Sequence, residues 1–430
     1  MAAPTHHPQT SAERLIATTI TSTWLLWLLG ALYIVGPVLG WTLAAMAAWR
    51  LYLAPGLPAE ERPAPLGSLV WVWLIGMLCM LIALLAGHAL NDLGAAKTLK
   101  SAVGWAKGWA LLGLFPFAAA VLNIRPAIIY RAVCRLGLQS LILMPLFIAA
   151  PKIGLPGELY TSPLAIVGGS GPEFFKVVLY TLEPGTGVAR WQFFAPWSPA
   201  AGMVAVIHVL CAIEERNRRW QIIGVLAGLA VALLSQSRLA LVAIAVVWPA
   251  AQIVARLRRP STWWLAAPFA LAVGLFAPAV LALADSLAND FKGARADSSR
   301  VRATLGRIAV ERWQNEAPWF GHGVVENGPH LVEYMPIGSH HSWYGLLFVK
   351  GVAGAAALAA PMAWSLFFCA RLALRLPIGR VGLSMALVLF LYSFGENLEV
   401  LAYLFWPALV LLGAAARAAA THPDQAASAG

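Results

Sequence analysis

Arginine and histidine side chains gather in one water-compatible segment, residues 286–341, which lies between two long apolar runs. Its basic and imidazole side chains include Arg295, Arg300, Arg302, Arg307, Arg312, His322, His340 and His341. A guanidinium group binds phosphate through two parallel hydrogen bonds. A neutral imidazole can accept a proton from a hydroxyl group near pH 7. These residue types in one segment predict an anion-binding site that also carries out acid–base chemistry.

In a helix over residues 298–315, these arginines would lie on different faces. At about 100° per residue, one face of that helix is formed by Val301, Leu305, Ile308 and Ala309. Arg302 falls towards this apolar side, where a guanidinium needs an anion, so we expect Arg302 to be functional. Arg300, Arg307 and Arg312 are expected to contact lipid phosphates from an interfacial helix. Arg300 is nevertheless kept as a candidate substrate-binding residue.

Three histidines of this segment, His322, His340 and His341, allow two interpretations each. His340 and His341 directly precede an apolar run, where one of them could act as a general base towards a hydroxyl group. The alternative is an interfacial histidine that caps a helix or contacts headgroups. His322, in a Gly-His-Gly sequence, either lines the site or belongs to a turn. Neighbouring histidines point in different directions, and no further ligand completes a shell, so the sequence predicts neither a metal nor another cofactor.

The elements that must position these residues are membrane helices. The chain of 430 residues is 60% hydrophobic and 11% charged, whereas a soluble domain has about 25% charged residues. Repeated long apolar runs predict an all-α polytopic membrane protein with about 12 transmembrane helices. The expected spans are residues 15–34, 37–53, 66–90, 104–124, 132–150, 198–213, 220–235, 239–254, 263–284, 343–372, 378–394 and 398–416.

This pattern divides the chain into five parts. Spans 1–9 occupy residues 15–285, and spans 10–12 occupy residues 342–418. The large loop 286–341 separates them, and polar tails cover residues 1–14 and 419–430. A second long non-membrane segment, residues 151–197, contains a strand–turn–strand pattern over residues 174–194.

The arginines in alternate links predict the orientation. The positive-inside rule places both termini in the cytoplasm, so loop 286–341 and segment 151–197 face the periplasm. Arg190, Arg238 and the loop arginines are exceptions to that rule. Arg238 at the end of an apolar helix is costly without an anion. The net charge of +11 fits loops that contact anionic lipid. We expect no nucleic-acid binding, because no basic-aromatic module is present.

Two carboxylates complete the candidate set. Glu396 and Glu399 lie at the outer end of the eleventh expected span. They could orient a sugar, or pair with the arginines that the positive-inside rule leaves unexplained.

Several of these residues form an ordered set of short motifs. They are Ser235-Gln-Ser-Arg238, Arg302, Pro318-Trp-Phe-Gly-His-Gly323, Ser339-His340-His341-Ser342 and Gly351-Val-Ala-Gly354. The set resembles the bacterial O-antigen ligase and O-antigen polymerase superfamily. Its members have a Ser/Thr-x-Ser/Thr-Arg segment at a periplasmic helix end, then a large periplasmic loop with an Arg, a Pro-x-x-Gly-x-Gly element and a His-Asn pair, and then a Gly-x-x-Gly. By spacing, His340 takes the place of the functional His, and His341 that of the Asn.

The resemblance implies a GT-C-like glycosyltransferase fold in the bacterial inner membrane, with its active site on the periplasmic side. It implies catalytic roles for His340, Arg238 and Arg302. Arg190 matches more loosely a further arginine of such proteins and is expected to contact substrate. The residues themselves add Arg300, His341, His322 and Glu396 as candidate substrate contacts.

Enzymes of this kind take a glycan from undecaprenyl diphosphate without metal or nucleotide, and they invert the anomeric centre. A ligase transfers the O-antigen polysaccharide to a hydroxyl of lipid A-core, whereas a polymerase joins repeat units on the lipid carrier. A transporter and a non-enzymatic scaffold for glycan assembly are the alternatives from other classes. The sequence shows no internal repeat of the kind common in transporters.

Overall fold

The computed structural model describes residues 7–169, 171–183, 187–259 and 296–422. Within these residues, 7 helices are long and apolar enough to cross a membrane, and α8 (Ser198–Ile213) and α14 (Pro377–Tyr392) are shorter apolar helices. The chain is therefore a multi-pass membrane protein built mainly from helices. The number of 12 spans stays a prediction, and the expected ninth span, residues 263–284, lies outside the described residues.

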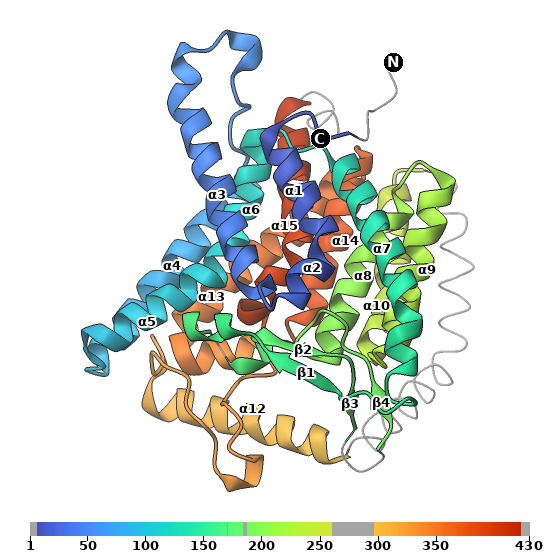
Figure 1. Cartoon of the computed structure of the whole chain (residues 1–430). Helices are drawn as coiled ribbons and strands as arrows, with labels where there is room; N and C mark the ends of the chain where they lie inside the picture. Colours follow the sequence, from blue (N-terminus) through green and yellow to red (C-terminus); the bar gives the residue numbers. More distant parts are fainter. Residues whose placement is uncertain (1–6, 170, 184–186, 260–295, 423–430) are drawn as a thin grey trace, which may run out of the picture.

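The bundle is arranged around its last helix. That helix is α15 (Leu398–Thr421). Besides α8 and α14, the other helices that form the bundle are α1 (Ser11–Thr21), α2 (Thr23–Leu28), α3 (Leu32–Leu53), α4 (Ser68–Leu90), α5 (Gly94–Lys107), α6 (Trp109–Leu122), α7 (Pro126–Ala149), α9 (Arg218–Leu234), α10 (Arg238–Arg256) and α13 (Ser342–Ala373). Helix α15 is apolar on all sides and is almost completely buried, as expected for a helix inside a bundle. It packs most extensively on α6 and α14, and Figure 1 shows it in the middle of the bundle.

Two predicted boundaries were wrong. The first apolar run breaks at Gly30, which has a φ of +64°, and not at residues 36–37, because α3 continues through Pro37. The predicted polar loop over residues 91–103 is mostly helix α5. Its alanine, lysine and leucine residues are strong helix formers, and their effect outweighed the polarity that suggested a loop.

The strands gather at one end of the bundle (Figure 1). Strands β1 (Glu158–Thr161) and β2 (Lys176–Val178) pair antiparallel, as do β3 (Thr181–Leu182) and β4 (Ala189–Arg190). The hairpin predicted over residues 174–194 is confirmed in a shorter form, whereas the pairing with β1 was not predicted. The short 3-10 segments are η1 (Ala54–Gly56), η2 (Ala59–Glu61), η3 (Pro163–Val167), η4 (Pro172–Phe175) and η5 (His330–Val332).

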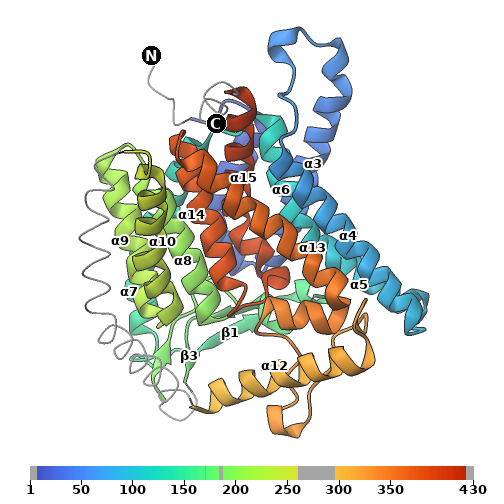
Figure 2. The same cartoon turned by 180° about the vertical axis from the view of Figure 1, so that it is seen from behind.

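Helix α12 (Ala296–Glu316) lies across this same end of the bundle, as both views show (Figures 1 and 2). Its predicted apolar face is confirmed, because Val301, Leu305 and Ala309 are buried. They pack in a small core with Phe348 of α13 and Leu84 of α4. The helix is thereby fixed against the bundle by its apolar side.

Helix α13 is broken at Gly351, and a loop segment repairs the break. Gly351 has a φ of 63° and a ψ of −164°, which are not helical values. Segment 318–323 runs beside it and replaces the lost helical hydrogen bonds. His322 N and Gly323 N donate to Phe348 O and Val349 O, both at 2.9 Å. In return, Pro318 O and Trp319 O accept from the backbone N–H groups of residues 352 and 353 at 2.9 and 3.1 Å. The Pro-x-x-Gly-x-Gly and Gly-x-x-Gly motifs are thus the two halves of one backbone junction.

Glycine is required on both sides of this junction. A Cβ atom on Gly351 would overlap the backbone of Trp319, and one on Gly321 would overlap the backbone at residues 349–351. Both glycines also have positive φ values, which residues with a side chain adopt only at a cost. Helix α4 covers the segment from the other side, where Asn91 Nδ2 donates to Gly321 O at 3.1 Å.

We expect Gly351→Ala to destabilise the folded protein by at least about 2 kcal/mol, because it adds a positive-φ penalty to a backbone clash. Thermal unfolding of the detergent-purified protein would measure the loss. Gly56→Ala is the matched control, since a Cβ atom there meets nothing within 4 Å. Equal melting temperatures for the two variants would contradict this account of the junction.

Candidate functional site

Three chain segments bring Arg302, His340 and Glu396 together at the α12 end of the bundle. Arg302 comes from α12, His340 from the segment that precedes α13, and Glu396 from the turn between α14 and α15. The Arg302 guanidinium is exposed on its own helix, not buried as its place near the apolar face suggested. Its positive charge nevertheless lowers the pKa of His340 and opposes the rise in the pKa of Glu396. The charge of one cation therefore acts on both an imidazole and a carboxylate here.

Glu396 is an almost fully buried carboxylate, with 2% of its surface exposed. Burial raises its pKa to about 7, although a hydrogen bond from Trp197 and the charge of Arg302 oppose the rise. The Trp197 indole Nε1–H donates to Glu396 Oε2 at 2.8 Å. Near neutral pH, this group is consequently present in both its protonated and its ionised form.

The turn that carries Glu396 is held by Ser342, the first residue of α13. Ser342 Oγ donates to Glu396 O at 2.7 Å and accepts from Leu398 N at 3.0 Å. Next to it, Trp343 Nε1 donates to Ser393 Oγ at 2.9 Å. These bonds join the start of α13, directly after the two histidines, to the turn that contains the carboxylate.

The two neighbouring histidines have different surroundings. His341 is the N-cap of α13, where its Nδ1 accepts from Tyr344 N at 3.3 Å. Its ring also stacks on the ring of Tyr344 at a centroid distance of 4.0 Å. The helix-capping interpretation therefore applies to His341.

The ring of His340 has no hydrogen bond to any residue that the structure describes. Burial, and secondly the charge of Arg302, lower its pKa to about 4. The imidazole is consequently neutral at pH 7 and has nitrogen atoms available to a ligand.

His322 and Arg312 belong to the support of the loop. The His322 ring stacks on Phe348 at 4.3 Å, and its Nε2 lies 2.7 Å from Glu316 Oε2. Arg312 binds Glu316 through two nitrogens and Glu326 through a third, at 2.6 Å. The expectation that Arg312 contacts lipid phosphate was wrong, because two carboxylates of its own loop surround it. Hydrogen bonds from Arg312 and, secondly, from His322 lower the pKa of Glu316 to about 2.

The remaining predicted residues lie at the same end of the bundle. Arg238 is half-buried and begins α10, one residue after the N-cap Ser237. Arg190, in β4, lies 3.7 Å from the carboxylate of Glu183. The Gln236 side chain donates to Ala189 O at 3.5 Å and so connects the turn before Arg238 to the strand of Arg190. Arg300 is exposed on α12.

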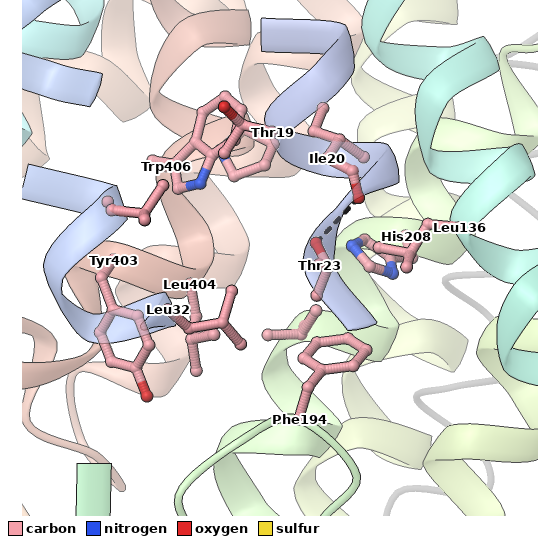
Figure 3. A pocket seen from close by; sticks show the side chains of 14 residues that line it. Thr19, Ile20, Thr23, Leu32, Leu136, Phe194, His208, Tyr403, Leu404 and Trp406 are labelled. Atoms are coloured by element: carbon pink, nitrogen blue, oxygen red, sulfur yellow. Dashed lines mark hydrogen bonds between the residues drawn. The ribbon is translucent and has the colours of Figure 1, made fainter. Parts of the chain in front are cut away.

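A cavity inside the bundle is separate from this site. It lies among α1, α2, α3, α8 and α15 and is lined mainly by apolar side chains such as Phe194, Leu404 and Trp406. Figure 3 shows His208 and Thr23 as polar groups at its edge. Its open space of about 30 Å³ holds one or two water molecules. It contains none of the predicted site residues, and it is too small for a sugar.

Sequence reasoning missed the residues that build the surroundings of Glu396. Trp197 and Ser342 were noted only as parts of a segment and a motif, yet they hold the carboxylate and its turn. Glu399 pairs with the buried Lys350, at 3.7 Å, and not with an arginine. A tryptophan directly before an apolar helix was the one available signal, and it indicates an interfacial position without naming a partner.

One comparison with known proteins bears on this site. Residues 223–359 match a family described as O-antigen ligase. The matched region is about a third of the 430 residues and includes Arg238, Arg302, His340 and the junction at Gly351. No curated protein matches the chain. The family match supports a place in the O-antigen ligase and polymerase superfamily.

We expect Ser342→Ala to destabilise the protein by about 1–3 kcal/mol, because the buried Glu396 carbonyl and Leu398 amide each lose a partner. Thermal unfolding would measure the loss. Ser384→Ala is the control: that buried hydroxyl donates only within its own helix, to Arg380 O at 3.0 Å. A Ser342 variant as stable as the Ser384 variant would show that the hydroxyl does not hold the turn.

Proposed function

We propose that this chain, with its O-antigen ligase family region at residues 223–359, is an O-antigen ligase of the bacterial inner membrane. It transfers polysaccharide from undecaprenyl diphosphate to a hydroxyl of lipid A-core on the periplasmic side. The observation that carries the proposal is the pairing of a neutral His340 with the charge of Arg302 inside the matched region. The membrane helices of the bundle fit a substrate whose carrier is a lipid.

The proposed reaction is a single displacement. Arg302, with Arg238, binds the diphosphate of the donor through charge-assisted hydrogen bonds. The acceptor hydroxyl oxygen forms a bond to the anomeric carbon as the bond from that carbon to the diphosphate oxygen breaks. Attack from the opposite side inverts the anomeric centre. The hydroxyl proton passes to a ring nitrogen of His340, and the arginines stabilise the charge that develops on the leaving diphosphate.

The base gains strength when the donor binds. With a pKa of about 4, His340 is neutral in the free protein but is a weak proton acceptor. A bound diphosphate would offset the charge of Arg302, one of the two causes of the low pKa, and so raise the pKa of His340 towards its usual range. Proton acceptance is thereby coupled to the presence of the leaving group.

The O-antigen polymerase is the second candidate, because it uses the same donor and the same chemistry. The two differ only in the acceptor. A lipopolysaccharide gel of a deletion strain separates them. We expect lipid A-core without any attached repeat units, since the transfer onto the core is lost. Core that carries a single repeat unit would instead indicate the polymerase.

Reconstituted transfer with purified protein, lipid-linked glycan and core acceptor tests the residues. We expect His340→Asn to lower the rate at least about 100-fold, as for the loss of a general base. His341→Asn should keep most of the activity, because asparagine is also a good N-cap residue. Arg302→Ala should lose activity, whereas Arg307→Ala, exposed on the same helix, should not. Transfer should proceed at the same rate with a metal chelator and without nucleotide.

The outcomes of that assay separate the roles. Correctly folded His340→Asn protein with the wild-type rate would exclude His340 as the base. If only the His341→Asn variant lost activity, His341 and not His340 would be the general base. Equal losses in the Arg302 and Arg307 variants would indicate a general effect of charge on α12.

Donor binding should weaken as the pH rises above 7. Glu396 has a pKa of about 7, and a diphosphate near Arg302 would raise it further, because like charges repel. Binding is then linked to protonation of Glu396, and affinity falls at most tenfold per pH unit above the pKa. Donor KM values from pH 6 to 8 measure this. Glu396→Gln should flatten the profile, while Glu399→Gln should leave it unchanged; an unaltered Glu396→Gln profile would disprove the linkage.

A further inference from the structure

A second group of arginines surrounds a hollow at the end of α10 and the turn from α13 to α14. Both views show that these parts of the helices lie at the end of the bundle opposite to α12 (Figures 1 and 2). The hollow has a volume of about 350 Å³ and lies between the end of α10 and the turn from α13 to α14. Its basic residues are Arg256, Arg258, Arg259, Arg375 and Arg380. The 19 residues of α10 separate this hollow from Arg238 by about 28 Å, at 1.5 Å per residue.

Positive charge in the hollow exceeds the negative charge available to it. Arg380 is paired with Glu214, which its guanidinium NH2 contacts at 2.7 and 2.8 Å. No acidic side chain lines the hollow in the described part of the chain. Arg375 is half-buried, and its Nε is fully buried without a hydrogen-bond partner among the described residues. A buried guanidinium donor without an acceptor is costly, so the hollow is suited to an anion.

The backbone also favours an anion in this hollow. Helix α14 begins at Pro377, which lines the hollow, and its N-cap residue Leu376 provides no side-chain acceptor. The N-terminal end of a helix carries a partial positive charge, which favours phosphate. Arginine side chains and a helix N-terminus thus surround the same hollow.

A second hollow indicates that the anion belongs to a lipid. It has a volume of about 250 Å³, includes Arg375 and Arg371 in its lining, and is otherwise formed mainly by Trp364, Phe367 and Phe368. Phe367 is 52% exposed and Trp364 is 36% exposed, as expected for aromatic side chains at a membrane interface. A soluble phosphate would use the first hollow alone, whereas a lipid has apolar chains that fit the second.

We infer that these two hollows form a binding site for an anionic phospholipid, with the headgroup phosphate on Arg375 and Arg258 and an acyl chain on Phe367 and Trp364. Basic pockets between membrane helices are a recurring mode of binding for anionic headgroups. The site is independent of glycosyl transfer, and it would hold the α10 end and the α13–α14 turn together at this membrane surface.

Native mass spectrometry of the purified full chain tests the site, with phosphatidylglycerol and phosphatidylcholine as probes. We expect phosphatidylglycerol to bind at least about tenfold more tightly, a difference of about 1.4 kcal/mol. Both lipids carry the phosphate, but phosphatidylcholine also carries a quaternary ammonium, which the arginines repel. Arg258→Gln together with Arg375→Gln should remove that preference, and Phe367→Ala should weaken phosphatidylglycerol binding severalfold. Arg14→Gln is the control, because Arg14 is an exposed arginine outside both hollows.

Each outcome of these binding measurements either supports or contradicts the lipid site. Equal binding of the two lipids, or an unchanged preference in the double variant, would overturn the site. If the double variant does not fold, Arg258→Gln alone serves, since its side chain is exposed. Glycerol 3-phosphate and inorganic phosphate are the soluble probes. Suppose that either raises the melting temperature as much as phosphatidylglycerol does, and that Phe367→Ala does not weaken phosphatidylglycerol binding. The hollow then binds a free anion, and the lipid assignment is wrong.

Discussion

The backbone junction between segment 318–323 and the break at Gly351 is the constraint on which the candidate site depends. Inside a membrane protein, an interrupted helix must have its free N–H and C=O groups paired by other parts of the chain. Here the loop supplies two donors and two acceptors. The junction fixes both ends of the loop: α12 ends just before residue 318, and His340 comes just before α13. A loop with little secondary structure of its own is thereby held in place relative to Arg302.

The electrostatics of the site follow from burial at the end of a helical bundle. Water would screen a guanidinium from an imidazole and a carboxylate, whereas limited access to water lets one charge affect both groups. Burial raises the pKa of Glu396 to about 7, and burial together with Arg302 lowers that of His340 to about 4. The carboxylate is thus the stronger proton acceptor of the two in the free protein. In the proposed reaction, an incoming diphosphate would change this balance, because it would compete with Glu396 for the positive charge of Arg302.

Apolar runs and motif order predicted the helical architecture, the apolar face of α12 and the segments that carry Arg302, His340 and Glu396. These features depend on periodicity and residue type, which a single sequence displays. The sequence did not reveal that His341 caps a helix, that Arg312 binds Glu316 and Glu326, or that Trp197 holds Glu396, since each contact joins side chains whose meeting depends on packing. Helix α5 was missed because its amphipathic sequence was interpreted by polarity and not by helix propensity.

The two ends of the bundle show how arginine serves different purposes in one membrane protein. The arginines of the opposite end fit the positive-inside rule, which concerns insertion and needs only charge. Arg375 needs more than that rule, because its Nε is buried beside an uncapped helix start. Arg302 is the reverse case: its side chain is exposed, yet its charge reaches the buried Glu396 and the half-buried His340. Exposure alone therefore does not separate functional from topological arginines. A more useful criterion is whether the charge of an arginine shifts the pKa of another group. Arg302 shifts the pKa values of His340 and Glu396, whereas Arg307 is not a cause of either shift, although both arginines lie exposed on α12.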